Sequence, residues 1–286
     1  MKNRLRLTLF TILIIVTATL PSCENITGCT DRFSFNYNSK ATKGGDECYS
    51  MGNCMGYAGG MVNSGTIGNT LYNPIYDQKM NGEVSIMRSF FNGVPANVYI
   101  LYEPGIEYRN AYASPDGTIL FGYHMHYYTI QNYGELPVAG VLAHEWGHRA
   151  QQTFNWNDYY RVEHKELEAD AFSGFYMALR KQWAWSQIQN YYANVYASGD
   201  YLYNSNNFHG TPNQRLMAAY KGVQVGVNAL QYGIQYTYNQ LHSIFFNEIR
   251  TNIAPRYATP PGTFAEVTYP QNLTEDYIKR LYPKIN

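Results

Sequence analysis

Residues 141–149, VLAHEWGHR, contain two histidines and a glutamate in a spacing that is typical of a metal-binding helix. His144 and His148 stand four positions apart, and Glu145 follows the first of them directly. Positions i and i+4 share one face of a helix, so two imidazoles there can bind one cation while the glutamate leans over the same place. The triplet therefore predicts a metal-binding helix, to be weighed against chance on a buried helix.

A third ligand must come from another segment, and KELEADAF at 165–172 supplies one. Glu166 and Asp170 are again four positions apart on one face, whereas Glu168 points to nearly the opposite side. The spacing selects Glu166 as the third ligand of a Zn²⁺ ion with one position open for water. Asp170 is expected to accept a hydrogen bond from the free ring N–H of a ligand histidine.

Together these motifs resemble the gluzincin metallopeptidases. The run RNAYASPDGTILFG, 109–122, is similar to the one before the zinc helix of CAAX-prenyl-type and heat-shock-type membrane endopeptidases, with Tyr112 where they usually have Phe. FHGTPNQR, 208–215, is similar to an element of the bacterial neutral zinc metallopeptidase family. The likeness covers roughly residues 108–222 and implies a zinc-dependent endopeptidase. This chain lacks the transmembrane helices of the membrane enzymes, so a prenylated substrate is not carried over.

The resemblance also implies roles for further residues. Zinc would activate a water molecule, and Glu145 would take its proton as the water attacks a peptide carbonyl. His209 is expected to stabilise the oxyanion. Arg215 is expected either to steady a carboxylate behind the site or only to solvate a helix. An extended peptide is expected to add along a sheet edge formed by Gly117, Thr118, Ile119, Leu120 and Phe121.

Two other functions remain open beside the endopeptidase. One keeps the zinc chemistry but acts as an amidase on cell-wall peptide, and the other is a catalytically silent surface binding protein on a zincin scaffold. Among the remaining histidines, His124 and His126 are expected on one strand face, where they could bind metal but are rather expected at a strand edge or lining a crevice. His164 is expected on a polar helix face, and His242 has no companion in the sequence. Trp146 is expected to pack in the core.

The composition narrows the partners. Of 286 residues, 21 are Lys or Arg and 21 are Asp or Glu, so no charge excess favours nucleic acid or an anionic membrane surface. The 29 tyrosines give a polar, uncharged surface that is common in exported proteins. A peptide or protein substrate is the expected partner, and the oligomeric state is open.

The N-terminal segment predicts export. Lys2, Arg4 and Arg6 precede an apolar run at 7–20, which is shorter than the roughly 20 residues that a membrane-spanning helix needs. The following LPSC resembles a bacterial lipobox that would lipidate Cys23, although Pro21 is atypical and leaves ordinary signal cleavage open. The expected location is the periplasm, the outer membrane as a lipoprotein, or the outer surface of a bacterium, with membrane contact only through the lipid.

Export places the other cysteines, Cys29, Cys48 and Cys54, where disulfides persist, so one pair and one remaining thiol are expected. The stretch 28–49 resembles a short cysteine-bounded module of exported Bacteroidetes-type proteins. That resemblance implies a disulfide between Cys29 and Cys48.

The predicted fold is α+β and zincin-like, with a small mixed sheet, an edge strand beside the zinc helix and a mostly helical second half. Residues 1–23 are the signal, 24–80 a loose Gly/Asn-rich leader, 81–255 the domain and 256–286 an irregular tail. Strands are expected in 84–91, 96–103 and 117–130, which are rich in β-branched and aromatic residues. Helices are expected from Pro137, over 160–183 with a continuation towards 197, over 211–222, and over 239–251.

Overall fold

The computed structural model of the protein divides into two units, Met1–Tyr49 and Ser50–Asn286. In the first unit, β1 (Thr27–Gly28) pairs in parallel with β2 (Lys43–Gly44). The predictions for the signal segment, the four cysteines and the tail fall outside the described residues. The structure describes residues 27–28, 43–44, 65–159, 161–181, 185–200 and 208–255.

The second unit contains one small mixed sheet in the order β3-β4-β6-β5. The central strands β4 and β6 run in parallel, and β3 and β5 join them in antiparallel pairing. Pairs such as Ile100 with Phe121 bring buried side chains side by side at the centre of the sheet. The strands are β3 (Thr66–Gly68), β4 (Asn97–Tyr102), β5 (Ala111–Ala113) and β6 (Thr118–Gly122).

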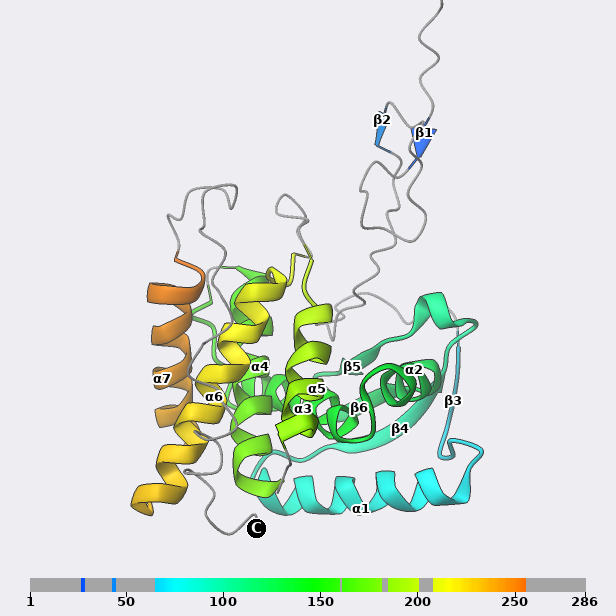
Figure 1. Cartoon of the computed structure of the whole chain (residues 1–286), viewed down its shortest axis with the longest axis horizontal. Coiled ribbons are helices and arrows are strands. Elements are labelled where there is room, and N and C mark those ends of the chain that lie inside the picture. Colours follow the sequence, from blue (N-terminus) through cyan, green and yellow to red (C-terminus); the bar gives the residue numbers. More distant parts are fainter. Residues whose placement is uncertain are drawn as a thin grey trace, which may run out of the picture. The chain divides into compact units, whose positions relative to one another are not determined.

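Helices make up most of the rest, so the α+β class is confirmed. In Figure 1 the sheet lies with α1 and α2 on the right, α4, α6 and α7 lie on the left, and α3 runs between the two groups. The helices are α1 (Pro74–Phe90), α2 (Tyr123–Tyr133), α3 (Leu136–Thr153), α4 (Val162–Arg180), α5 (Trp185–Ala197), α6 (Pro212–Tyr232) and α7 (Tyr238–Glu248), with short turns η1 (Ile106–Tyr108) and η2 (Ile249–Ile253).

Two expected strands are wrong, because their residues form helices. Residues 84–90 belong to α1, which buries Met80, Val84 and Met87 at helical spacing and is capped by the Asn73 side chain. Residues 123–130 belong to α2. In both segments the β-branched and aromatic content suggested a strand, but the buried positions follow a helical period. The expected leader 24–80 is also wrong from residue 65 onward, where β3 and α1 begin the domain.

The predicted start of α6 is confirmed and its predicted end is wrong. Thr211 caps the helix in a capping box with Gln214, and Pro212 is its first residue. The helix runs past Gly222 to a left-handed glycine, Gly233. A Cβ at Gly222 would lie 1.9 Å from the carbonyl oxygen of Ala171 in α4. Gly222 therefore allows close packing of α4 and α6, and it does not end the helix.

The prediction that residues 117–121 form the edge of the sheet is wrong. The strand of Thr118–Gly122 lies inside the sheet, and the short strand β5 covers its outer side. A tight turn with Gly117 at φ +97° folds the chain back, so that Ser114 N–H donates to Thr118 C=O at 2.7 Å. The free edge beside α3 is therefore β5, which carries Tyr112.

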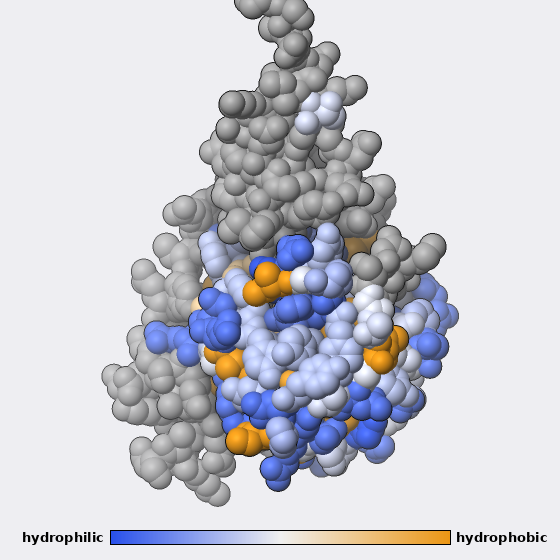
Figure 2. All heavy atoms as spheres, turned by 90° about the vertical axis from the view of Figure 1, so that its right-hand side faces the viewer, coloured by the Kyte–Doolittle hydropathy of each residue, from blue (hydrophilic) through white to orange (hydrophobic). Residues whose placement is uncertain are grey.

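Aromatic residues occupy both the surface and the core. Figure 2 shows one face on which hydrophilic and intermediate residues dominate among those drawn in colour, with hydrophobic residues scattered singly. Tyr191 and Tyr192 of α5 are buried, and Trp146 is a core residue as predicted. No helix within the described residues is long and apolar enough to cross a membrane.

Candidate metal centre

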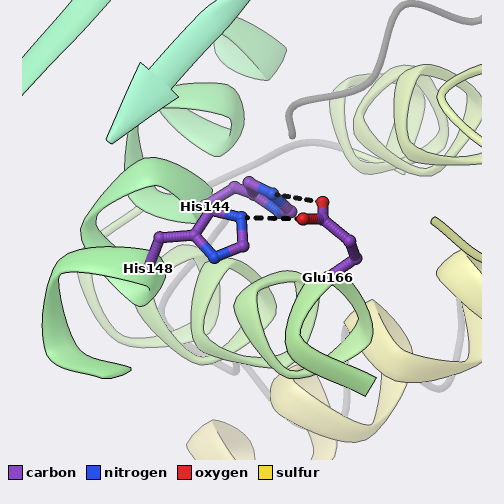
Figure 3. Close-up of side chains that lie close together, drawn as sticks. All are labelled: His144, His148 and Glu166. Atoms are coloured by element: carbon purple, nitrogen blue, oxygen red, sulfur yellow. Dashed lines mark ion pairs between the residues drawn. The ribbon is translucent and has the colours of Figure 1, made fainter. Parts of the chain in front are cut away.

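Two helices bring three potential metal ligands together in the interior (Figure 3). His144 and His148 lie on successive turns of α3, and Glu166 faces them from α4. The Nε2 atom of His144 lies 3.5 Å from Oε2 of Glu166, and Nε2 of His148 lies 3.4 Å from its Oε1. All three side chains are at most 1% exposed. The prediction that Glu166, and not Glu168, faces the two histidines is confirmed.

These spacings fit residues that share a cation. Zinc bonds of 2.0–2.1 Å in tetrahedral geometry place neighbouring ligand atoms roughly 3.3 Å apart, whereas direct N–H···O hydrogen bonds are about 2.7–3.2 Å long. One ligand atom from each residue lies within 4.8 Å of the others. The group could therefore hold a metal ion.

The charge of the group also suits a cation. Burial opposes ionisation of Glu166, but the neighbouring His148 and His144 outweigh burial and hold its pKa well below the usual range. An ionised carboxylate and two imidazoles form a donor set that binds divalent transition metals.

Behind His144 lies a buried ion pair. The Nδ1 atom of His144 is 2.9 Å from Oδ1 of Asp170. Arg215, fully buried, donates from Nη2 to the same oxygen at 2.9 Å and from Nε to the other oxygen. Because an ionised carboxylate only accepts, a neutral His144 must donate from Nδ1, which leaves the Nε2 lone pair for a metal. The predicted position of Asp170 is confirmed, and Arg215 steadies that carboxylate.

Behind His148 lies an amide. The Nδ1 atom of His148 is 2.9 Å from Oε1 of Gln151, whose Nε2 donates to the Lys165 carbonyl at 2.8 Å and to Oε2 of Glu168 at 3.1 Å. Since both of these partners only accept, the orientation of the amide is fixed, and His148 must donate from Nδ1. Its Nε2 lone pair is thereby also left for a metal. Sequence reasoning missed Gln151, although a polar side chain three positions after a ligand on one helix could have pointed to it.

The network continues from Glu168 towards the surface. His242 of α7 lies 2.6 Å through Nδ1 from Glu168 Oε1, and Tyr159 donates to the other oxygen in a short hydrogen bond. The Nε2 atom of His242 is 3.2 Å from Oδ2 of Asp158, which is 54% exposed. The expectation that His242 has no companion is therefore wrong, because α7 lies far along the chain but packs beside α4.

Glu145 follows His144 on α3, and its carboxylate has no hydrogen bond within the described residues. It is fully buried, and neither oxygen has a hydrogen-bond partner among the described residues. Burial raises its pKa to about 8, although the neighbouring His148 lowers it. A carboxylate held in this way can take up a proton near neutral pH.

His209 lies in the segment that leads into α6, and its charge contributes to lowering the pKa of Glu166, which places it near the site. Its Nδ1 atom is 3.6 Å from Oδ2 of Asp200, and its side chain is 15% exposed. The pKa of Tyr112 on β5 is raised mainly by burial, and the negative charge of Glu145 also contributes to raising it. Both residues therefore lie within electrostatic reach of the centre.

The remaining histidines lie apart from this centre. His124 and His126 lie on α2, so their predicted strand face is wrong. His164, predicted on a polar helix face, lies on α4, where it is fully buried with Nε2 2.9 Å from the Ala254 carbonyl. Within the described ranges, the group of His144, His148 and Glu166 is the only cluster of three His, Cys, Asp or Glu residues whose ligand atoms converge in this way.

Comparisons with known proteins identify no relative. No family model, no curated protein and no solved structure matches this chain.

Proposed function

We propose that this protein is a zinc-dependent endopeptidase with a zincin-like domain of the gluzincin type. The observation that carries the proposal is the convergence of two histidine Nε2 atoms and one glutamate, at distances of 3.4 and 3.5 Å. The HExxH residues on α3 and the glutamate on α4 have the order and spacing of that group. A mixed sheet with a short antiparallel edge strand beside α3 adds support.

Zinc is the metal that this donor set fits best. Two imidazoles and one carboxylate, with a fourth position open, are the ligands of catalytic zinc sites, whereas calcium and magnesium prefer oxygen ligands alone. When bound there, zinc acts as a Lewis acid and makes water a nucleophile at neutral pH. Asp170 and Gln151 keep both Nε2 lone pairs directed into the site.

Glu145 is the proposed general base. Its carboxylate lies on the helix face next to the two histidines, and its oxygens have no hydrogen bond to the described residues. It would take the proton from the attacking water and pass it to the leaving amine. His209 is the proposed donor to the oxyanion that forms on the peptide carbonyl.

The edge strand β5 is the proposed place for the substrate backbone. Hydrogen bonds of Ser114 N–H to Thr118 C=O and of Gly122 N–H to Asn110 C=O set the alternation of the ladder, so the backbone groups of Ala111 and Ala113 point outward. Two of these four groups are occupied, because Ala111 N–H donates to the Asn110 side chain and Ala113 C=O accepts from Gln152.

The groups that remain at this edge are Ala111 C=O and Ala113 N–H. They flank Tyr112. In an antiparallel peptide, the residue on one side of the position opposite Tyr112 would donate its N–H to Ala111 C=O, and the residue on the other side would accept at its C=O from Ala113 N–H. Backbone pairing of this kind does not depend on the substrate sequence, which favours broad specificity with Tyr112 as a contact.

Export to the periplasm, outer membrane or cell surface, with a lipid on Cys23, is part of the proposal. It rests on the basic residues and apolar run at the N-terminus and on the LPSC motif. A peptidase in that location would meet proteins and cell-wall peptides.

The test is cleavage of casein by the full-length protein with and without a chelator, together with metal analysis. Glu145→Gln should keep the zinc content, because this carboxylate is not a ligand, and should lose cleavage. Glu163→Gln provides a matched control, since Glu163 is also a buried glutamate, but its carboxylate pairs with Arg161 at 2.8 Å. This control should cleave normally.

Purified cell wall, tested in parallel, separates the alternatives. Cleavage of cell wall alone would replace the endopeptidase by an amidase that uses the same centre. Bound zinc with no cleavage of either substrate would favour a binding protein and contradict the proposal.

A further inference from the structure

A cavity lies on the side of α3 that faces away from the metal centre. It has a volume of about 450 Å³ and is bounded by α1, α2 and the first half of α3. Leu142, which lines it, precedes His144 by two positions and so points roughly 200° away from it around the helix. The cavity is therefore separate from the metal centre, and its volume falls within the range of about 300–1,000 Å³ that small-molecule sites have.

The lining of the cavity is mostly apolar and carries no net charge. Its charged side chains pair with each other, Lys79 with Glu135 at 2.6 Å and Lys181 with Glu83 in a short ion pair. A charged ligand would find no unpaired countercharge among them, so burial of its charge would be unfavourable. The apolar lining residues are Tyr76, Met80, Ile86, Ile130, Leu136, Val138, Ala139 and Leu142.

One polar side chain in this lining has no hydrogen bond. His126 is 3% exposed, and neither of its ring nitrogens has a hydrogen-bond partner among the described residues. It is held by rings instead, with the centroids of Tyr76 and Phe121 at 5.1 and 6.4 Å. Burial lowers its pKa to about 4, so the ring is neutral at pH 7. Buried polar atoms in native proteins are nearly always hydrogen-bonded, which points to a partner that the chain itself does not supply.

We propose that this cavity binds a neutral, mostly apolar small molecule that carries one hydroxyl group hydrogen-bonded to His126. A neutral imidazole offers one donor and one acceptor, and a hydroxyl can both accept and donate, so it suits either ring nitrogen. The apolar walls take up the rest of the molecule. The paired charges at the cavity disfavour carboxylates, phosphates and amines. This inference does not depend on the metal centre or on peptidase activity.

The experiment measures binding of octan-1-ol to the full-length protein by ligand-observed NMR, with 1-fluorooctane as the comparison probe. The two probes have the same chain length, but the fluoro compound cannot donate and accepts poorly. Octan-1-ol should bind saturably and about threefold to tenfold more tightly than 1-fluorooctane, as expected for one net hydrogen bond. Chelator should leave both affinities unchanged, whatever it does to peptide cleavage.

Two variants locate the site. His126→Phe keeps a ring among the aromatic neighbours and should remove the preference for octan-1-ol while binding of 1-fluorooctane persists. Gly82→Leu should weaken both probes by tenfold or more, because Gly82 lines the cavity and a Cβ there meets nothing within 4 Å, so the leucine can fill open space without disturbing α1. His124→Phe is the matched control, since His124 lies on the same helix outside the lining.

The inference would be overturned by absence of saturable octan-1-ol binding to the wild-type protein. It would equally be overturned if Gly82→Leu, which does not alter the core, left binding unchanged, or if His126→Phe, shown to be folded by its thermal melt, kept the preference for the alcohol. An affinity change in His124→Phe equal to that in His126→Phe would also contradict it.

Discussion

The buried histidines on the two sides of α3 are held in opposite ways. At the metal centre, the Nδ1 atoms of His144 and His148 are each 2.9 Å from an oxygen that can only accept. In the cavity on the other side, His126 has no hydrogen bond to either nitrogen within the described ranges. All three rings are at most 3% exposed, so burial alone does not distinguish the two sides.

The difference lies in what each ring can bind. A histidine whose Nδ1–H is held by an acceptor presents a fixed Nε2 lone pair, which is suited to a cation. A neutral histidine without partners has no fixed tautomer and suits a ligand that can both donate and accept. Four substitutions test this contrast.

Removal of a ligand should have the largest effect. Glu166→Ala takes away the carboxylate that lies 3.4 and 3.5 Å from the two Nε2 atoms. It should lower zinc affinity by at least about a hundredfold, more than the loss of an outer partner does. Glu168→Ala is the matched control, because Glu168 binds Gln151 and His242 on the other side of α4. Metal analysis after dialysis measures both. If Glu168→Ala lost the metal and Glu166→Ala kept it, the ligand assignment would be wrong.

Removal of the buried cation behind His144 should cost stability. Arg215→Met leaves the buried carboxylate of Asp170 without its charged partner and should lower the free energy of unfolding by about 3–5 kcal/mol. Arg149→Met is a suitable control, because the main partners of Arg149 are the carbonyls of Pro95 and Ser114 and no buried anion is left behind. Urea unfolding compares the two. Equal losses would mean that the ion pair contributes nothing specific.

Loss of the amide behind His148 should act mainly on the metal. Gln151→Leu removes the acceptor that orients Nδ1 and should weaken zinc binding by about 10- to 100-fold. Gln152→Leu, one position further on, contacts Ala113 and Arg149 and should leave zinc affinity unchanged. Competition with a chromogenic chelator measures the affinities. Unchanged zinc binding in Gln151→Leu would show that this hydrogen bond does not orient the ligand.

The histidine without partners should make stability depend on pH. The unfolded His126 has an ordinary pKa of 6.5, whereas burial lowers it to about 4 in the folded protein, so between these values protons bind preferentially to the unfolded chain. Stability should therefore fall as the pH falls from 6.5 towards 4. His126→Phe should reduce this fall by about 1–3 kcal/mol. Thermal melts across this range, with His124→Phe as control, would contradict the prediction if the two variants behaved alike.

The metal centre was largely predictable because its geometry is local. The i, i+4 spacing in two helices fixes which side chains share a face, and it placed His144 with His148 and Glu166 with Asp170 before any tertiary contact was known. The helices at 84–90 and 123–130 were not predictable in the same way. Their composition suggested a sheet, but burial against the core selected helices.

The identity and spacing of the candidate ligands, the start of α6 and the α+β class can be derived from local sequence, because they depend on helical periodicity and capping within a few residues. Only the tertiary structure decided that β5 forms the sheet edge, that Glu168 meets His242 of α7, and that His126 lines a cavity. The contact between Glu168 and His242 alone joins residues 74 positions apart in the chain. Their positions follow from how helices and strands pack against one another, and no local pattern of residues encodes that packing.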